Sequence, residues 1–72
     1  MSDRRRLDEL TPRQQQVVRL IREGLSDKEI AVKLGIEEQT VKNLLRGAYR
    51  ATGTHNRVAL LGWAYEIRER VA

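Results

Sequence analysis

A short predicted helix, joined to the next predicted helix by a glycine turn, constrains the fold of this chain more than any other feature. Ser26 and Glu29 have the spacing of a capping box, in which each side chain bonds to the backbone N–H group of the other residue. Gly35 follows about two helical turns later and can adopt the left-handed conformation that ends many helices. Because so short a helix is unstable alone, it must pack against neighbours. The sequence therefore predicts a bundle whose helices stabilise one another.

Similar signals mark the segment that precedes this pair. Thr11 is placed as an N-cap, Pro12 takes the first helical position, and Gln14 completes a second capping box. Gly24 is expected to end this helix. The apolar residues that repeat at helical spacing between these ends are Val17, Val18 and Ile21.

Two longer helices complete the prediction. The third is expected over residues 37–52 with Gly53 as its stop, and the fourth begins after Asn56. Because no alternating pattern is long enough for a convincing strand, we predict an all-α fold of four helices. The expected inner faces are Val41, Leu45, Ala48 and Thr52 in the third helix, and Leu60, Trp63, Ala64, Ile67 and Val71 in the fourth.

Length and composition limit the organisation of the chain. Its 72 residues allow one small domain, expected over residues 10–72, after a basic and flexible segment at residues 1–9. Cysteine is absent, which excludes disulfides and thiolate metal sites. No apolar run approaches the roughly 20 residues that span a bilayer, and the charged N-terminus does not resemble a signal segment. We expect a cytoplasmic protein without a membrane partner.

The junction between the second and third helices has the pattern of a helix-turn-helix pair. Ala31 is small where the two helices would cross, and Gly35 permits the positive φ angle of the turn. Val41 would fill the space between the helices. These residue types at these spacings, with capped helices on both sides, are typical of a helix-turn-helix.

The outer face of the third helix carries residue types that read DNA. Lys and Arg bind guanine edges, whereas Asn binds adenine. The net charge of +4 also favours an anionic partner, with nucleic acid first. A solvated polar face is the alternative, but beyond Glu37 and Glu38 this face holds no acid, so we predict DNA contact. The residues concerned are Gln39, Lys42, Asn43, Arg46 and Arg50.

Gly47 interrupts this helix with a poor helix former. It lies four residues beyond Asn43, so a bare backbone there could let the helix lie close to DNA. The alternative is a tolerated surface residue.

The segments "LTPR", "EGLSDKEIA", "LGI", "TVKN" and "NR" together make the chain resemble a known family. Residues 10 to about 66 are similar to the LuxR/FixJ/GerE-type DNA-binding domain of bacterial transcription regulators. The resemblance implies a four-helix bundle whose third helix enters the major groove. It also implies a fourth helix that pairs two protomers on a two-fold site.

The resemblance assigns roles to individual residues. Lys42, Asn43 and Arg46 match the positions that face bases. Ser26, Lys28 and Thr40 match positions near the phosphate backbone. Gln39, Arg50 and Arg57 are further residues that we expect to contact phosphates, and such contacts support affinity rather than sequence choice.

Val58, Leu61 and Tyr65 form a second apolar strip on the fourth helix. We expect this strip to be a homodimer interface, with packing back on the first helix as the alternative.

Several positions depart from the pattern of that family, which usually has larger or differently charged residues there. The changes thin the expected packing around the third helix. They are Gln14, Glu37, Leu44, Ala48, Ala51 and Thr52.

Other functional classes find little support in the sequence. The single histidine, His55, precedes a helix and has no catalytic partner pattern, so we expect no enzyme, no cofactor and no small-molecule ligand. The main alternative is a module that binds a sigma factor, RNA polymerase or another regulator. A promoter-recognition module like region four of sigma factors is a related possibility. Since no receiver or ligand-binding domain precedes the helices, we expect a stand-alone regulator.

Overall fold

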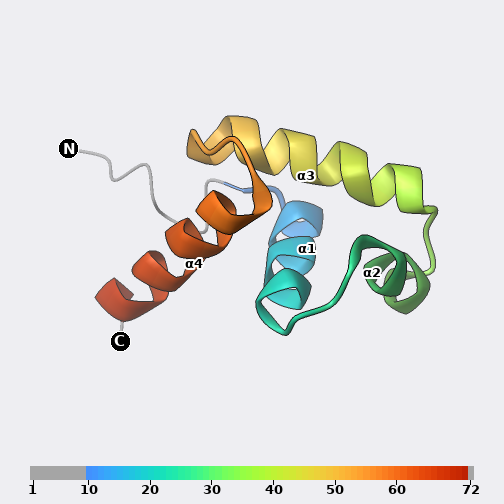
Figure 1. Cartoon of the computed structure of the whole chain (residues 1–72), viewed down its shortest axis with the longest axis horizontal. Helices are drawn as coiled ribbons and strands as arrows, with labels where there is room; N and C mark the ends of the chain where they lie inside the picture. The colour runs from blue at the N-terminus through green and yellow to red at the C-terminus, as the bar shows by residue number, and fades with distance from the viewer. Residues whose placement is uncertain (1–9, 72) are drawn as a thin grey trace.

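A computed structural model describes the backbone of residues 10–71 and the side chains of residues 10–66. It contains α1 (Pro12–Arg22), α2 (Asp27–Leu34), α3 (Glu38–Thr52) and α4 (Arg57–Val71) (Figure 1). Within residues 10–71 no strand is formed, which confirms the all-α prediction. The basic segment predicted at residues 1–9 lies outside the described residues, as do the side chains of Ile67 and Val71.

Both predicted capping boxes are confirmed at atomic detail. The Thr11 hydroxyl accepts from the Gln14 backbone N–H at 3.1 Å, and Gln14 Oε1 accepts from the Thr11 N–H at 3.0 Å. Ser26 and Glu29 form the same reciprocal pair, at 3.2 and 2.8 Å. These bonds satisfy backbone donors that an α-helix leaves unpaired at its N-terminus.

The predicted C-terminal ends of α2 and α3 and the predicted start of α4 are confirmed as well. Gly35 and Gly53 cap α2 and α3 in the left-handed conformation, with φ angles of 69° and 72°. The Asn56 side-chain oxygen accepts from the Ala59 backbone N–H at 2.8 Å and so caps α4. The N-cap of α3 differs, because Glu37 holds that place without a side-chain hydrogen bond.

The core lies around α1, which packs against each of the other three helices. Figure 1 shows α3 along one edge of the molecule, with α1 and α2 beneath it. Thr52, expected inside, is half-buried, and its hydroxyl donates to the Ala48 carbonyl at 2.9 Å. None of the described helices is long and apolar enough to cross a bilayer. The buried side chains are Leu10, Val17, Val18, Leu20, Ile21, Ile30, Ala31, Val41, Leu45, Ala48, Leu60, Trp63 and Ala64.

Candidate nucleic-acid interface

The α2–α3 pair has the geometry expected of a helix-turn-helix. The two helices pack against each other, and Ala31 of α2 and Val41 of α3 are both buried in the core. The chain reverses at Gly35, and the backbone N–H of Ile36 donates to the Ala31 carbonyl at 3.0 Å. This bond closes the turn at the end of α2, two residues before α3 begins. The positive φ angle predicted for Gly35 is confirmed, and Ala31 and Val41 are buried as their predicted roles require.

The two faces of α3 differ completely in exposure. The inner face is buried at Val41, Leu45 and Ala48, which pack into the core. The opposite face is exposed, and between residues 39 and 50 the chain contains no acidic residue. That exposed face includes every predicted DNA-contact residue of α3, namely Gln39, Thr40, Lys42, Asn43, Arg46 and Arg50.

One side-chain hydrogen bond orders this exposed face. Gln39 Nε2 donates to Asn43 Oδ1 at 3.2 Å, across one turn of α3. Amide pairs four residues apart are a known stabilising arrangement on helices. The bond links the side chains of the two residues near the N-terminus of α3.

The start of α2 supplies the next two predicted contacts. Ser26 and Lys28 are both exposed there. The Ser26 hydroxyl oxygen accepts the capping bond from Glu29, which leaves its hydrogen able to donate to a partner. The positive end of the α2 dipole lies at the same place and favours an anion.

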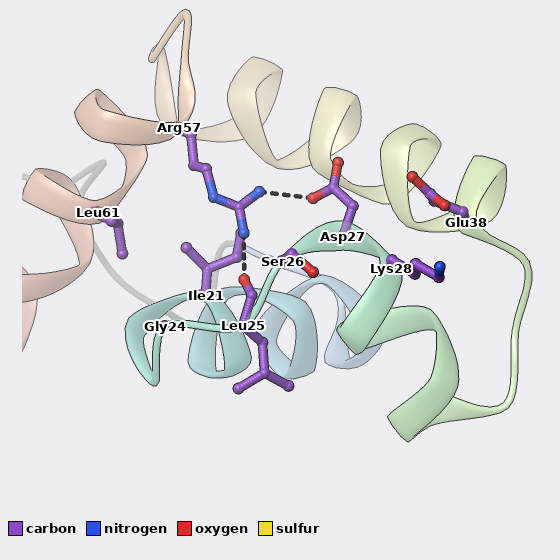
Figure 2. Close-up of a pocket in the computed structure, with 9 residues that line it drawn as sticks. All are labelled: Ile21, Gly24, Leu25, Ser26, Asp27, Lys28, Glu38, Arg57 and Leu61. Carbon is purple, nitrogen blue, oxygen red and sulfur yellow. Dashed lines mark hydrogen bonds and ion pairs between the residues drawn. The ribbon is translucent and has the colours of Figure 1, made fainter.

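Arg57, predicted to contact a phosphate, is bound within the protein. Its Nη1 atom lies 2.6 Å from Asp27 Oδ1, and its Nη2 atom donates to the Leu25 carbonyl. Figure 2 shows the guanidinium reaching from the start of α4 to the α1–α2 connection, in a pocket that Ser26 and Lys28 also line. The guanidinium has five N–H donors, so the phosphate contact stays a prediction. The sequence interpretation missed Asp27, because thirty positions separate the pair and no local spacing reveals it.

Gly47 lies on the flank of α3 that faces α1. A Cβ atom placed there would be 2.6 Å from Gln14 Nε2, much closer than real Cβ atoms approach a neighbour. The missing side chain therefore makes room for Gln14 of the first capping box. This contact gives the missing side chain a role inside the protein, and close approach of Gly47 to DNA stays a prediction.

The apolar strip of α4 divides into three different environments. Val58 is 79% exposed, whereas Leu61 is half-buried and packs against the core. Tyr65 is 49% exposed, with the Arg22 guanidinium 5.3 Å from its ring centroid. Its hydroxyl lies 3.4 Å from the Arg22 carbonyl oxygen. Tyr65 thus packs back on α1, and the role of the strip in a dimer stays a prediction.

Comparison with known proteins agrees with this geometry. The family of bacterial regulatory proteins called the luxR family matches residues 8–64. A nitrate/nitrite response regulator homolog of Haemophilus influenzae is 49% identical over 53 residues, which are 74% of this chain and 26% of that protein. The two-component response regulator PprB of Pseudomonas aeruginosa is 47% identical over 51 residues, 71% of this chain and 18% of that protein.

A longer alignment joins the chain to the nitrate/nitrite response regulator NarL of Escherichia coli, 34% identical over 64 residues. It covers 89% of this chain and 30% of NarL. The chain thus spans less than a third of the length of each of these relatives. No solved structure matches it significantly. The match over residues 8–64, together with the capped helix pair and the exposed basic face of α3, shows that this chain belongs to the LuxR family of bacterial regulatory proteins and folds as its helix-turn-helix DNA-binding domain.

Proposed function

We propose that the chain binds duplex DNA sequence-specifically, as a homodimer with α3 in the major groove, and regulates transcription from the bound site. The single observation that supports this most is the exposed face of α3. This face is polar and basic and holds no acid from residue 39 to residue 50. The opposite face of the same helix is buried in the core. A major groove admits one such helix. The DNA-binding domain would comprise residues 10–72, and the protein would act in the cytoplasm.

Base readout would come from the middle of α3. Lys42, Asn43 and Arg46 are exposed within little more than one turn, so they can reach neighbouring base pairs together. Lys42 and Arg46 carry donors only, which suits guanine. Asn43 can both donate and accept.

Phosphate contacts would fix the register of α3 in the groove. The residues proposed for this are exposed, apart from Arg57, and lie at the start of α2, along α3 and at the start of α4. Such contacts make affinity fall as salt rises, without selecting a sequence. They are Ser26, Lys28, Gln39, Thr40, Arg50 and Arg57.

Pairing of two chains would use α4. Val58 is the most exposed residue of its apolar strip, and Leu61 and Tyr65 lie one and two turns further along the same helix. A two-fold pair built this way would present two copies of α3 to two half-sites.

Selection of bound duplexes from a random pool tests this function. Arg46→Ala should weaken binding to the preferred duplex by about 1–3 kcal/mol and relax base choice at one position. Arg19→Ala, which removes the same charge from the exposed surface of α1, should leave base choice unchanged. An equal loss on every sequence for Arg46→Ala would reassign it to a phosphate.

A second candidate is binding to a sigma factor, RNA polymerase or another regulator. The exposed valine at position 58 favours it, because an apolar partner could cover that side chain. If the wild-type chain enriches no duplex even at low salt but binds one of these proteins, this second function replaces the first.

A further inference from the structure

Among the exposed residues of α3, Gln39 has a specific bonded partner. Its Nε2 atom donates to Asn43 Oδ1 at 3.2 Å, and both side chains lie on the face opposite buried Val41 and Leu45. The bond therefore lies on the surface that would meet the bases. Since Gln39 Nε2 has a second hydrogen, the residue can still donate to a phosphate.

This bond constrains the orientation of the Asn43 amide. An asparagine amide has a carbonyl oxygen that accepts and an amino group that donates. A free asparagine uses both ends and so pairs with adenine, which offers one donor and one acceptor in the major groove. When Gln39 uses one lone pair of Oδ1 and holds that atom toward itself, the Nδ2 group keeps both of its hydrogens for DNA.

We propose that Gln39 is a positioning residue that orients Asn43 to present donors, so that Asn43 reads guanine rather than adenine. This inference rests on the proposed DNA-binding function and adds to it a rule of sequence choice. Guanine offers two acceptors, N7 and O6, in the major groove, whereas the cytosine edge offers a donor. Guanine is thus the base that suits an amide presenting Nδ2 alone.

The orientation of the Asn43 amide matters for base choice because the neighbouring base readers cannot change their polarity. Lys42 and Arg46 donate in every orientation, because neither carries an acceptor. Of the three proposed base readers, Asn43 is thus the one whose polarity can be set by a neighbour. With Gln39 in place, the exposed face from residue 42 to residue 46 presents donors throughout.

The test exchanges Gln39 for residues of opposite polarity. Asn43→Ala first identifies the base position that Asn43 reads, because preference there is lost. The side chain introduced by Gln39→Lys can only donate hydrogen bonds, so it should bind Asn43 Oδ1 as glutamine does. The preference for guanine at that base position should then be kept. Gln39→Glu accepts instead, so it should bind Nδ2 and turn Oδ1 toward the groove. The guanine-to-cytosine preference on the contacted strand should then shift by about tenfold or more, toward cytosine or adenine.

The effect of charge at residue 39 is separated from the effect of the Asn43 amide orientation by making Gln39→Lys and Gln39→Glu in a chain that also carries Asn43→Ala. There Gln39→Glu should weaken and Gln39→Lys should strengthen overall affinity through the phosphates, with no change of base choice. A third variant, Gln39→Ala, removes the bond to the Asn43 amide. Duplexes with adenine at that base position should then be selected as well. Denaturant unfolding followed by fluorescence of buried Trp63 should show that every variant folds, with Gln39→Glu slightly more stable and Gln39→Lys slightly less stable, because residue 39 lies in the first turn of α3.

The possible failures are distinguishable. An adenine preference in the wild-type chain, or the same base choice in Gln39→Lys and Gln39→Glu, overturns this inference and leaves the proposed function intact. Absence of any enriched duplex for the wild-type chain overturns both.

Discussion

At the scale of single residues, Gly47 shows how an exposed pattern can hide an internal contact. Alanine normally stabilises a helix interior by about 1 kcal/mol relative to glycine. Here a methyl group would lie 2.6 Å from Gln14 Nε2, and Gln14 Oε1 accepts the capping bond from the Thr11 N–H. The Gln14 side chain can move, but its movement would strain or break that bond. The gain in helix propensity and the loss at the cap therefore oppose each other.

We expect Gly47→Ala to change the free energy of unfolding by less than about 0.5 kcal/mol, because a cap bond worth about 1 kcal/mol offsets the helix gain. In a Gln14→Ala background the clash is removed, so the same exchange should stabilise the protein by about 1 kcal/mol. Denaturant unfolding followed by Trp63 fluorescence measures both. Equal stabilisation in the two backgrounds would show that Gln14 yields without cost.

At the scale of the elements, the Asp27–Arg57 pair joins the start of α4 to the start of α2. The guanidinium lies 2.6 Å from the carboxylate and also bonds the Leu25 carbonyl, within the connection between α1 and α2. These side chains are only partly exposed, at 35% and 25% for Arg57 and Asp27. The ion pair alone would contribute little at such exposure, but a bond from a charged donor to a backbone carbonyl contributes more. Arg57 thereby helps to hold α2 in place beneath α3.

Arg57→Ala should lower the free energy of unfolding by about 1–2 kcal/mol, since it leaves the Leu25 carbonyl and Asp27 without this partner. Arg50→Ala is the matched control, because Arg50 is exposed near the end of α3 and its removal should change stability by less than about 0.5 kcal/mol. Both exchanges should reduce the salt dependence of DNA binding by about one phosphate. If the two variants had the same free energy of unfolding, the bonds of Arg57 would not contribute to the stability of the fold.

At the scale of the whole molecule, the proposed dimer can be tested at the exposed apolar side chains. Val58 on α4 and Val32 on α2 are 79% and 77% exposed, so the same residue type stands on two separate helices. Only Val58 belongs to the strip proposed for dimer formation. Leu61 is a poorer probe because it packs against the core, and a charge there would also destabilise the monomer.

Val58→Asp should therefore convert a dimer into monomers without changing the unfolding midpoint of the monomer, because the carboxylate would be buried only in the dimer. Val32→Asp adds the same charge to α2 and should leave the mass unchanged. Sedimentation equilibrium measures the mass of each variant. Dimers that persist in the Val58→Asp variant would remove this part of α4 from the interface.

The positions of the helices and their buried faces could be predicted from sequence because their causes are local. Capping bonds join residues three positions apart, as in Ser26 and Glu29, and a glycine such as Gly35 ends a helix through its own backbone. Helical periodicity then separates the buried Val41 from the exposed Lys42. The exposed α3 face, and with it the candidate base readers, follows from the same pattern.

Contacts between helices required the tertiary structure. Arg57 and Asp27 are thirty positions apart, and Gln14 and Gly47 are separated further still. Whether such residues meet depends on the angles at which α1 packs against its neighbours, which no local spacing encodes. The sequence by itself thus determined where each helix begins, ends and turns its apolar face. Only the tertiary structure decided that Arg57 is held by Asp27 and that Gly47 makes room for Gln14, because helix crossing brings those distant residues together.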